Sequence, residues 1–283
     1  MPFAGLRVLS LESRRAKEMD ALIRREGGDP FVAPSVQERS LGDHGESVRF
    51  IERLEAGDFD MLICMTGTGL AFLRDQFLAH NTNPQESAVR LGAALRRATI
   101  ISRGPKPLPI LSELGARAQI VVPEPNTWKE IVAAVVTRPE RRIAVQEYGR
   151  PNLEMNAALE ALGASVTPIV LYRWDLPSDM EPLREAASRL AHQRIDVVLF
   201  TSSIQLDHLM LVAGELGLSS QVHEALCATV IASVGPVMTA ALEAASIPVD
   251  VVPIHPKMAA LVKAAAEESA ELIARKRTPI RLH

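Results

Sequence analysis

Residues 196–203 read DVVLFTSS and contain the pattern that decides the fold. The apolar run 197–200 is followed at once by hydroxyl side chains, which are common at helix N-termini. Similar short runs recur along the chain and alternate with longer segments of helical apolar period. This alternation is typical of parallel sheets flanked by helices, so we predict an α/β fold. We expect strands over 7–10, 31–34, 61–64, 99–102, 119–122, 142–146, 166–171, 196–200, 229–233 and 249–252.

The two halves of the chain resemble each other in order, at an offset of about 130 to 136 residues. The turn at 103–105 corresponds to the turn at 234–236, and both contain Gly-Pro. The Val-Val-Pro sequence at 121–123 recurs at 251–253. Chance similarity between apolar strands does not predict these matches at nearly one offset. We therefore predict a duplicated unit and two similar domains, each a parallel sheet flanked by helices.

Two short polar segments, 37–42 and 173–177, are candidate linkers. Each follows the first strand-helix-strand unit of its half. If the chain crosses between domains at both segments, residues 43–172 form a continuous domain. The other domain is then discontinuous and consists of residues 1–36 and 178–283.

Composition and charge exclude several classes of protein. The chain has 283 residues, of which 47% are hydrophobic and 23% charged, and its formal net charge is −3. This balance gives no overall field that would attract nucleic acid or an anionic membrane. The N-terminus does not read as a secretory leader, and no apolar run reaches about 18 residues. We therefore expect a cytoplasmic protein without a membrane span.

Motifs for cofactors and metals are also missing from the sequence. Cys64 and Cys227 lie far apart in apolar runs, and the seven histidines are not spaced as ligands, so we expect no metal. No phosphate-binding loop, no G-x-G-x-x-G after a strand and no G-x-S-x-G elbow is present. Nucleotide binding and serine hydrolase chemistry are therefore disfavoured.

The loops that follow the predicted strands are rich in glycine, hydroxyls and cations. In open parallel sheets, ligands bind at the carboxyl ends of the strands. For any single loop, capping of the next helix is the better explanation of a Ser, Thr or Asn. Recurrence in both halves instead indicates a cleft that binds carboxylates or phosphates through backbone amides. The candidate binding residues are Thr66, Gly67, Arg103, Gly104, Lys106, Tyr148, Gly149, Arg150, Asn152, Thr201, Ser202, Ser203, Gly235, Pro236 and Lys257.

The two tyrosines of the chain, Tyr148 and Tyr172, both fall at predicted strand ends. Tyr172 closes the strand expected over 166–171, where the second linker begins. A phenol with a pKa near 10 can donate a proton to a leaving hydroxyl. The alternative is an aromatic side chain that only packs the hinge, and spacing does not decide between the two.

Several segments, taken together, resemble the uroporphyrinogen-III synthase family. These are Phe-Thr-Ser-Ser at 200–203, Ala-Ser-Val-Gly-Pro-Val-Met-Thr at 232–239, Pro-Ile-His-Pro-Lys-Met at 253–258 and Leu-Tyr-Arg at 171–173. The resemblance implies two α/β domains joined by a two-stranded linker. It also implies the cyclisation of linear hydroxymethylbilane to uroporphyrinogen III in tetrapyrrole biosynthesis, with inversion of ring D, loss of water and no cofactor.

The resemblance assigns roles to particular residues. Tyr172 becomes the candidate acid for hydroxyl departure, and Thr239 is the second catalytic candidate. Ser202 and Ser203 match hydroxyls of the family. The implied partner is a small linear tetrapyrrole with eight carboxylates, which helix N-termini, hydroxyls and the cations Arg103, Lys106, Arg150 and Lys257 would bind. Neither nucleic acid nor membrane is implied, and we expect a monomer.

Two carboxylates depart from this pattern. Glu12 and Glu147 occupy equivalent places in the repeat, beside the presumed polyacidic substrate, and would repel it unless Arg14 or Arg150 pairs with them. They favour an alternative: a non-catalytic two-domain sensor, or a divergent paralogue, that binds a tetrapyrrole or another polycarboxylate. A periplasmic-type solute-binding protein is a weaker alternative, because the sequence shows no signal peptide.

Overall fold

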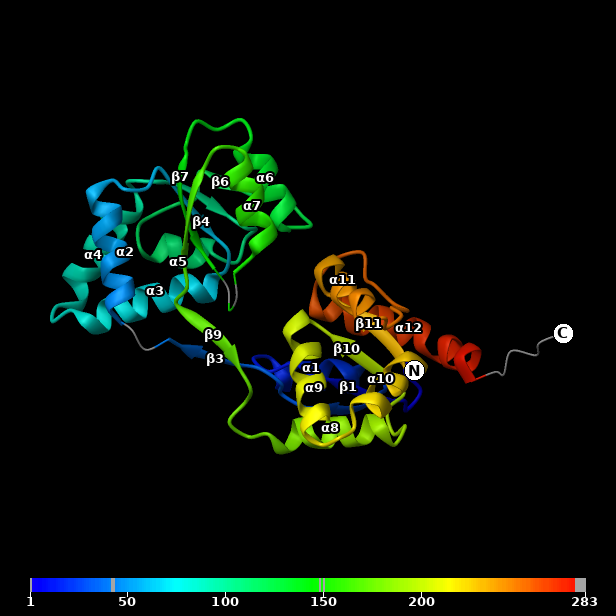
Figure 1. The fold of residues 1–283 in the computed structure, drawn as a ribbon. Helices are drawn as coiled ribbons and strands as arrows, with labels where there is room; N and C mark the ends of the chain where they lie inside the picture. The colour runs from blue at the N-terminus through cyan, green and yellow to red at the C-terminus, as the bar shows by residue number, and fades with distance from the viewer. Residues whose placement is uncertain (1, 42–43, 148, 150, 278–283) are drawn as a thin grey trace. The chain divides into compact units, whose positions relative to one another are not determined.

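The computed structural model describes residues 2–41, 44–147, 149 and 151–277 (Figure 1). The chain divides into two compact units. The first comprises Met1–Gln37 and Asp175–His283, and the second comprises Glu38–Trp174. The continuous domain was expected over residues 43–172. The second unit is slightly longer at both ends, from Glu38 to Trp174.

Each unit alternates strands with helices. The first unit contains the strands β1 (Arg7–Ser10), β2 (Asp29–Val32), β10 (Val197–Phe200) and β11 (Val230–Ser233), and the helices α1 (Ala16–Arg25), α8 (Glu181–Ala191), α9 (Ser203–Glu215), α10 (Ser219–Ala228), α11 (Pro236–Ala244) and α12 (Met258–Arg277). The second contains the strands β4 (Met61–Cys64), β5 (Thr99–Ser102), β6 (Ile120–Val121), β7 (Arg142–Gln146) and β8 (Ser165–Ile169), and the helices α2 (His44–Ala56), α3 (Gly67–His80), α4 (Pro84–Leu95), α5 (Leu108–Glu113), α6 (Trp128–Val135) and α7 (Leu153–Ala161). The chain passes between the units along β3 (Gln37–Ser40) and β9 (Tyr172–Asp175), which pair as a separate two-stranded sheet.

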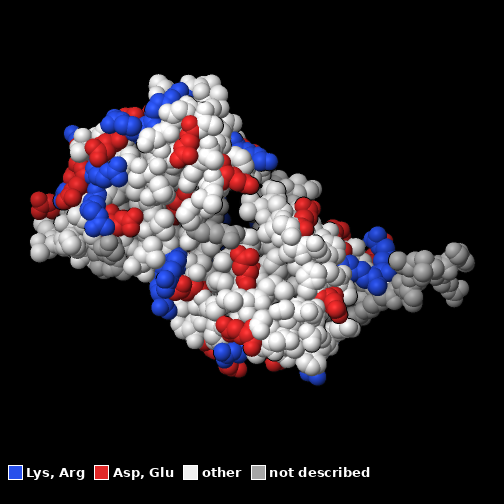
Figure 2. All heavy atoms as spheres, in the orientation of Figure 1, with Lys and Arg blue, Asp and Glu red and all other residues white. Residues whose placement is uncertain are grey.

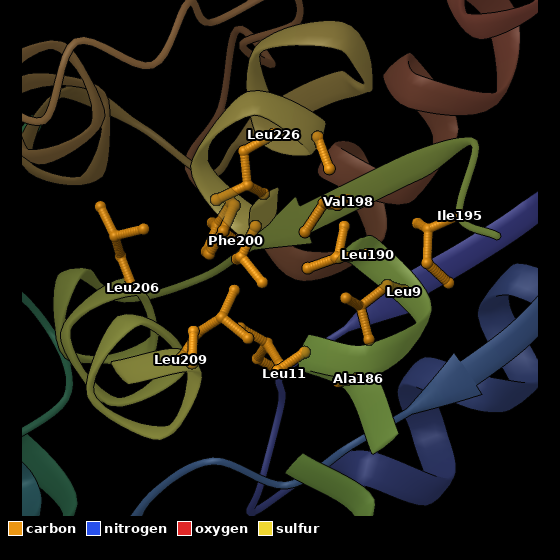
Figure 3. Packing of buried hydrophobic residues seen from close by; sticks show 14 of the residues in the cluster. Leu9, Leu11, Ala186, Leu190, Ile195, Val198, Phe200, Leu206, Leu209 and Leu226 are labelled. Carbon is orange, nitrogen blue, oxygen red and sulfur yellow. The ribbon is translucent and has the colours of Figure 1, made fainter. Parts of the chain in front are cut away.

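The sheet of the first unit has the strand order β11-β10-β1-β2, and all neighbouring strands are parallel. Successive side chains of a strand point to opposite faces, so both faces of this buried sheet are apolar. Leu9, Val198 and Phe200 pack with residues of α8, α9 and α10 on one face (Figure 3). Val8 and Leu199 pack with α1 and α12 on the other face.

The sheet of the second unit has the strand order β6-β5-β4-β7-β8, again entirely parallel. Leu62 and Ile100 pack with α2, α3 and α4. Ile63 and Ile101 lie on the opposite face and pack with α6 and α7. The predicted α/β class is confirmed, with two similar parallel sheets flanked by helices.

The duplication is visible in the strand orders. The order β11-β10-β1-β2 of the first unit corresponds to β5-β4-β7-β8 of the second. In each unit a strand-helix-strand segment from one half of the chain extends a sheet built from the other half. β1 pairs with β10, and β7 pairs with β4.

Several predicted strand limits are wrong at the edges of the sheets. β8 ends at Ile169, opposite Gln146, because the partner strand β7 ends there. Tyr172 therefore begins β9 rather than closing a parallel strand. The segment expected over 249–252 forms only one bridge, from Val251 to Ala232. The strand expected over 31–34 is β2, and its register with β1 places it at Asp29–Val32.

The molecular surface carries charges of both signs. On the face drawn in Figure 2, basic and acidic side chains are interspersed over the described part of the chain. None of the described helices combines the length and the apolar character needed to cross a bilayer.

Candidate functional site

The turn from β10 into α9 places three predicted residues at the carboxyl edge of the first sheet. Ser202 is the N-cap of α9. The amides of Thr201 and Ser202 both donate to Gln205 Oε1, at 2.8 and 3.3 Å. The next amides belong to the first turn of the helix, where intrahelical acceptors are lacking. Any anion at this edge would therefore meet the amides that begin at Ser203, and the bonds to Gln205 hold the turn in shape.

A glutamate approaches the same turn from β1. The hydroxyl of Thr201 donates to Glu12 Oε2 at 2.8 Å, and the amide of Arg15 donates to Glu12 Oε1 at 3.2 Å. The Thr201 hydroxyl therefore donates its hydrogen bond to a carboxylate of the protein itself. The sequence named Arg14 as a residue that could offset the charge of Glu12, and the structure shows Thr201 and the amide of Arg15 as hydrogen-bond partners.

The turn from β11 into α11 contains Thr239, the second catalytic candidate. Thr239 Oγ1 donates to the hydroxyl of Ser233 at 2.9 Å. Ser233 is fully buried and donates in turn to the carbonyl of Gly235 at 3.1 Å. Gly235 is the N-cap position, and Pro236 begins the helix. Two hydroxyls thus fix the turn that presents the first amides of α11.

The hydrogen bond from a buried serine hydroxyl to the carbonyl of the glycine two residues later recurs in the second unit. Ser102 ends β5, is fully buried and donates its hydroxyl to the carbonyl of Gly104 at 2.7 Å. Both turns read Ser-x-Gly-Pro, at 102–105 and 233–236. The Gly-Pro pairs were predicted to be corresponding turns, and the role of the serines that precede them was not predicted. The shared Ser-x-Gly-Pro spacing was the signal that could have revealed them.

Lys257 lies on the loop beside the N-terminus of α11. A side chain at Gly235 would meet Pro256 at 3.2 Å, so this loop packs closely against the turn. The side chain of Lys257 is exposed, and its amide donates to the carbonyl of His255 at 2.7 Å. Lys257 thus follows directly after the residue that packs against the turn.

In the second unit, the loops after β4 and β5 touch each other. Thr66 is the N-cap of α3, and its hydroxyl accepts the amide of Gly69 at 3.0 Å. A Cβ on Gly67 would lie 2.5 Å from the carbonyl oxygen of Lys106, so only glycine fits there. Arg103 is half-buried and its amide donates to the carbonyl of Cys64, while Lys106 is exposed.

Tyr172 reaches this cluster from β9. Its phenol oxygen lies 3.3 Å from Thr66 Oγ1. The ring is stacked on Phe72, with centroids 5.1 Å apart, and only 1% of the residue is exposed. The structure thus gives Tyr172 a packing contact and also places its hydroxyl beside another predicted residue.

The turn after β7 holds the remaining candidates. Asn152 is the N-cap of α7, and its side chain accepts the amide of Met155 at 2.9 Å. Gly149 has a φ of 69°, and a Cβ there would lie 2.5 Å from the ring of Trp174. Tyr148 and Arg150 lie outside the residues that the structure describes.

Glu147 opens the same turn and is fully buried. Its Oε1 accepts the side-chain amide of Asn156 at 3.2 Å and the backbone amide of Asn152 at 3.4 Å. Burial raises the pKa of the Glu147 carboxyl, while these hydrogen bonds and the charge of Arg103 act in the opposite direction. Glu147 was predicted to lie beside the site, and its hydrogen bond with Asn156 is seen only in the structure.

Within the described part of the chain, no cluster of three His, Cys, Asp or Glu side chains is arranged to hold a metal ion. Cys64 is buried in β4, and burial raises the pKa of its thiol to about 12. Cys227 lies half-buried in α10, with its sulfur 4.0 Å from His223 Nδ1.

Comparison with known proteins agrees with this architecture. A relative from Bacillus subtilis, the uncharacterized protein YjjA, is 27% identical over 263 residues, which cover 91% of this chain and 94% of that protein. The crystal structure of wild-type uroporphyrinogen III synthase from Thermus thermophilus is similar in fold, with a TM-score of 0.53, 22% identity and coverage of 95% of this chain and 100% of that one. A mutant of the same synthase gives a TM-score of 0.66 at 20% identity, covering 96% and 100%. The family model for uroporphyrinogen-III synthase HemD matches residues 17–263, which include turns from both units, and the chain belongs to that family.

Proposed function

We propose that this protein is a uroporphyrinogen-III synthase, a lyase that cyclises hydroxymethylbilane with inversion of ring D and loss of water. The observation that carries the proposal is the family match over residues 17–263, which spans all the candidate catalytic and binding residues. The proposal extends to a place in tetrapyrrole biosynthesis, a monomeric state and the cytoplasm. It also treats the two compact units as the functional domains.

The site chemistry supports this function without a strong nucleophile. The substrate brings eight carboxylates, and first-turn amides of α3, α7, α9 and α11 are suited to bind them. Arg103, Lys106 and Lys257 add positive charge at the same strand ends. Departure of hydroxide leaves a cation that the pyrroles stabilise themselves, so the protein mainly needs to orient the chain.

Within this proposal, Tyr172 assists the departure of the hydroxyl group. Its phenol lies 3.3 Å from Thr66 Oγ1, and a hydrogen bond between two hydroxyls fixes the direction of the phenol. Thr239 is the corresponding candidate in the first unit. Its hydroxyl is oriented by Ser233.

The test is an isomer assay. Purified protein is mixed with hydroxymethylbilane, the products are oxidised, and the type I and type III isomers are separated by chromatography. We expect type III to predominate. If only the spontaneous type I isomer accumulates at every protein concentration, the enzymatic proposal fails.

A second candidate function is binding without turnover, as expected of a sensor. The observation that favours it is the bond from Thr201 to Glu12, which places a carboxylate where a polycarboxylate substrate is expected. Calorimetry with uroporphyrinogen and an isomer assay on the same preparation separate the two functions. Tight binding together with type I product alone identifies the sensor.

A further inference from the structure

Two buried oxygen atoms beside β7 have no hydrogen-bond partner among the side chains that the structure describes. They are Glu147 Oε2 and Asn156 Oδ1. Buried polar atoms are nearly always paired, because leaving one without a partner costs the desolvation of that atom. An ionised carboxylate can only accept hydrogen bonds, and an amide oxygen can also only accept. Both oxygens therefore lack a hydrogen-bond donor.

The remaining atoms of the same two side chains are already bonded. Asn156 Nδ2 donates to Glu147 Oε1 at 3.2 Å. One proton on Glu147 Oε2 supplies the missing donor and allows that oxygen to bond Asn156 Oδ1. Because Asn156 Nδ2 already bonds Oε1, this second bond would close a ring between the carboxylic acid and the amide and would satisfy both oxygens. We infer that Glu147 is a positioning residue that is held as the neutral carboxylic acid by Asn156.

The surroundings of Glu147 come from three elements. α7 contributes Asn156 and the amide of Asn152, at 3.4 Å. β8 contributes the carbonyl of Ile169, which accepts the Glu147 amide at 3.0 Å. The loop after β5 contributes Arg103, the one charged group among the described residues whose effect on Glu147 is resolved, and it favours the ionised form. The complete burial of Glu147 disfavours the ionised form.

Glu12, the equivalent residue in the repeat, has the opposite environment. Both of its carboxylate oxygens accept hydrogen bonds, from the Thr201 hydroxyl and the Arg15 amide. An ionised carboxylate satisfies these donors. The contrast makes Glu12 the matched control for Glu147.

A neutral Glu147 bears on substrate binding, and this step rests on the proposed function. The carboxyl group opens the turn that leads to the N-terminus of α7, where a substrate carboxylate would bind. In the neutral form it adds no repulsion. Ionisation at alkaline pH breaks the ring with Asn156 and places a negative charge at the turn, so the affinity for a polycarboxylate falls.

Infrared spectroscopy tests the protonation state directly. At neutral pH the other carboxyl groups are expected to be ionised, so a carbonyl band of a protonated carboxylic acid should be visible in the wild type, persist in Glu12→Gln and vanish in Glu147→Gln. Absence of the band from the wild-type protein at neutral pH overturns the inference, and this result does not depend on whether either variant folds. A band that persists in folded Glu147→Gln also overturns it.

Kinetics test the consequence for substrate binding. We expect the KM for hydroxymethylbilane to rise at alkaline pH with the same midpoint at which the infrared band disappears, and this rise to be absent from Glu147→Gln. A rise that is unchanged in the variant overturns the positioning role. If no preparation forms type III product, the proposed function fails, and the infrared band still decides the state of Glu147.

Discussion

The two glutamates at equivalent positions of the repeat show how strongly a residue's chemistry depends on the atoms that meet it. Both carboxylate oxygens of Glu12 accept a hydrogen bond, whereas in Glu147 only Oε1 does, and Oε2 has no donor. Each residue follows the first strand of its half, β1 or β7, so the sequence presents them alike. The difference comes from packing, and it is the reason for the first prediction.

Glu147→Gln should be more stable than the wild type at alkaline pH. Burial raises the pKa of Glu147 in the folded protein above that of the unfolded chain. The stability that comes from the neutral carboxyl is thus fully present below the unfolded pKa, about 4.3, and is lost as pH rises through the folded pKa. Glutamine keeps the ring with Asn156 and does not titrate.

Urea unfolding followed by circular dichroism across this pH range measures the effect. The difference in unfolding free energy between the variant and the wild type should grow with pH, in favour of the variant. Glu12→Gln serves as the control, and it should leave the alkaline loss in place. A difference that is constant with pH would show that Glu147 has no raised pKa.

Tyr172→Phe separates the packing role of this residue from a role in catalysis. The phenylalanine keeps the stacking on Phe72 and loses only the hydroxyl near Thr66. We expect a loss of about 0.5–1.5 kcal/mol in stability, as for one hydrogen bond. If the phenol acts as the acid, formation of the type III isomer should slow by roughly ten- to a thousandfold.

The matched control is Phe72→Leu, which disturbs the stacking and retains the phenol. It should lower the midpoint of thermal unfolding more than Tyr172→Phe does and reduce turnover less. Equal turnover of Tyr172→Phe and the wild type would leave Tyr172 with its packing role alone.

At the scale of helices and strands, the sequence was informative where both faces of a strand are buried. β4 and β10 were predicted at nearly their observed positions, because continuous apolar runs are typical of central parallel strands. Edge segments carry less of this signal. The segment around Val251 forms one bridge, and β3 and β9 are polar strands that only the family resemblance implied.

The candidate site was predictable to the extent that it depends on strand ends. Thr66 and Ser202 are at N-cap positions, as capping preferences predict. Gln146 bonds the amide of Thr66 through tertiary packing and was not predictable. Gln205 completes a capping box with Ser202, which the local Ser-x-x-Gln spacing could have indicated. The acid–amide contact of Glu147 depends on burial, which a local pattern does not reveal.

The contact between the loops after β4 and β5 predicts a large effect of one methyl group. Gly67→Ala would place a Cβ 2.5 Å from the carbonyl oxygen of Lys106, which is backbone and cannot rotate away. We expect a loss of about 1–3 kcal/mol, as for overpacked sites. The free energy of unfolding in denaturant measures it.

Gly214→Ala is the control for helix propensity. Gly214 is exposed in α9, and the nearest atom to its Cβ would be Ser219 Oγ at 3.5 Å, an ordinary contact. This variant should gain about 0.5–1 kcal/mol, because alanine is the better helix former. A gain of stability at Gly67 as well would mean that the two loops are not in contact.

At the scale of the whole molecule, each of the two parallel sheets combines strands from both halves of the sequence. β1 and β2 belong to the unit that contains β10 and β11. The continuous unit contains β4, β5, β7 and β8. Each unit has its own buried clusters on both sheet faces, so destabilising one core should loosen all the strands of that unit together.

Leu199→Ala in β10 and Leu62→Ala in β4 test this arrangement by amide hydrogen exchange. Both leucines are fully buried, and each change should cost about 2–5 kcal/mol. Leu199→Ala should speed exchange in β1, β2, β10 and β11, although β1 lies far away in the sequence, because Leu199 pairs with Ser10 of β1. Leu62→Ala should speed exchange in β4, β5, β7 and β8 and leave β1 protected. If Leu199→Ala instead speeds amide exchange in β7 and β8 and leaves β1 protected, each half of the chain folds as a contiguous unit. The assignment of β1 and β2 to the unit of β10 and β11 would then be wrong.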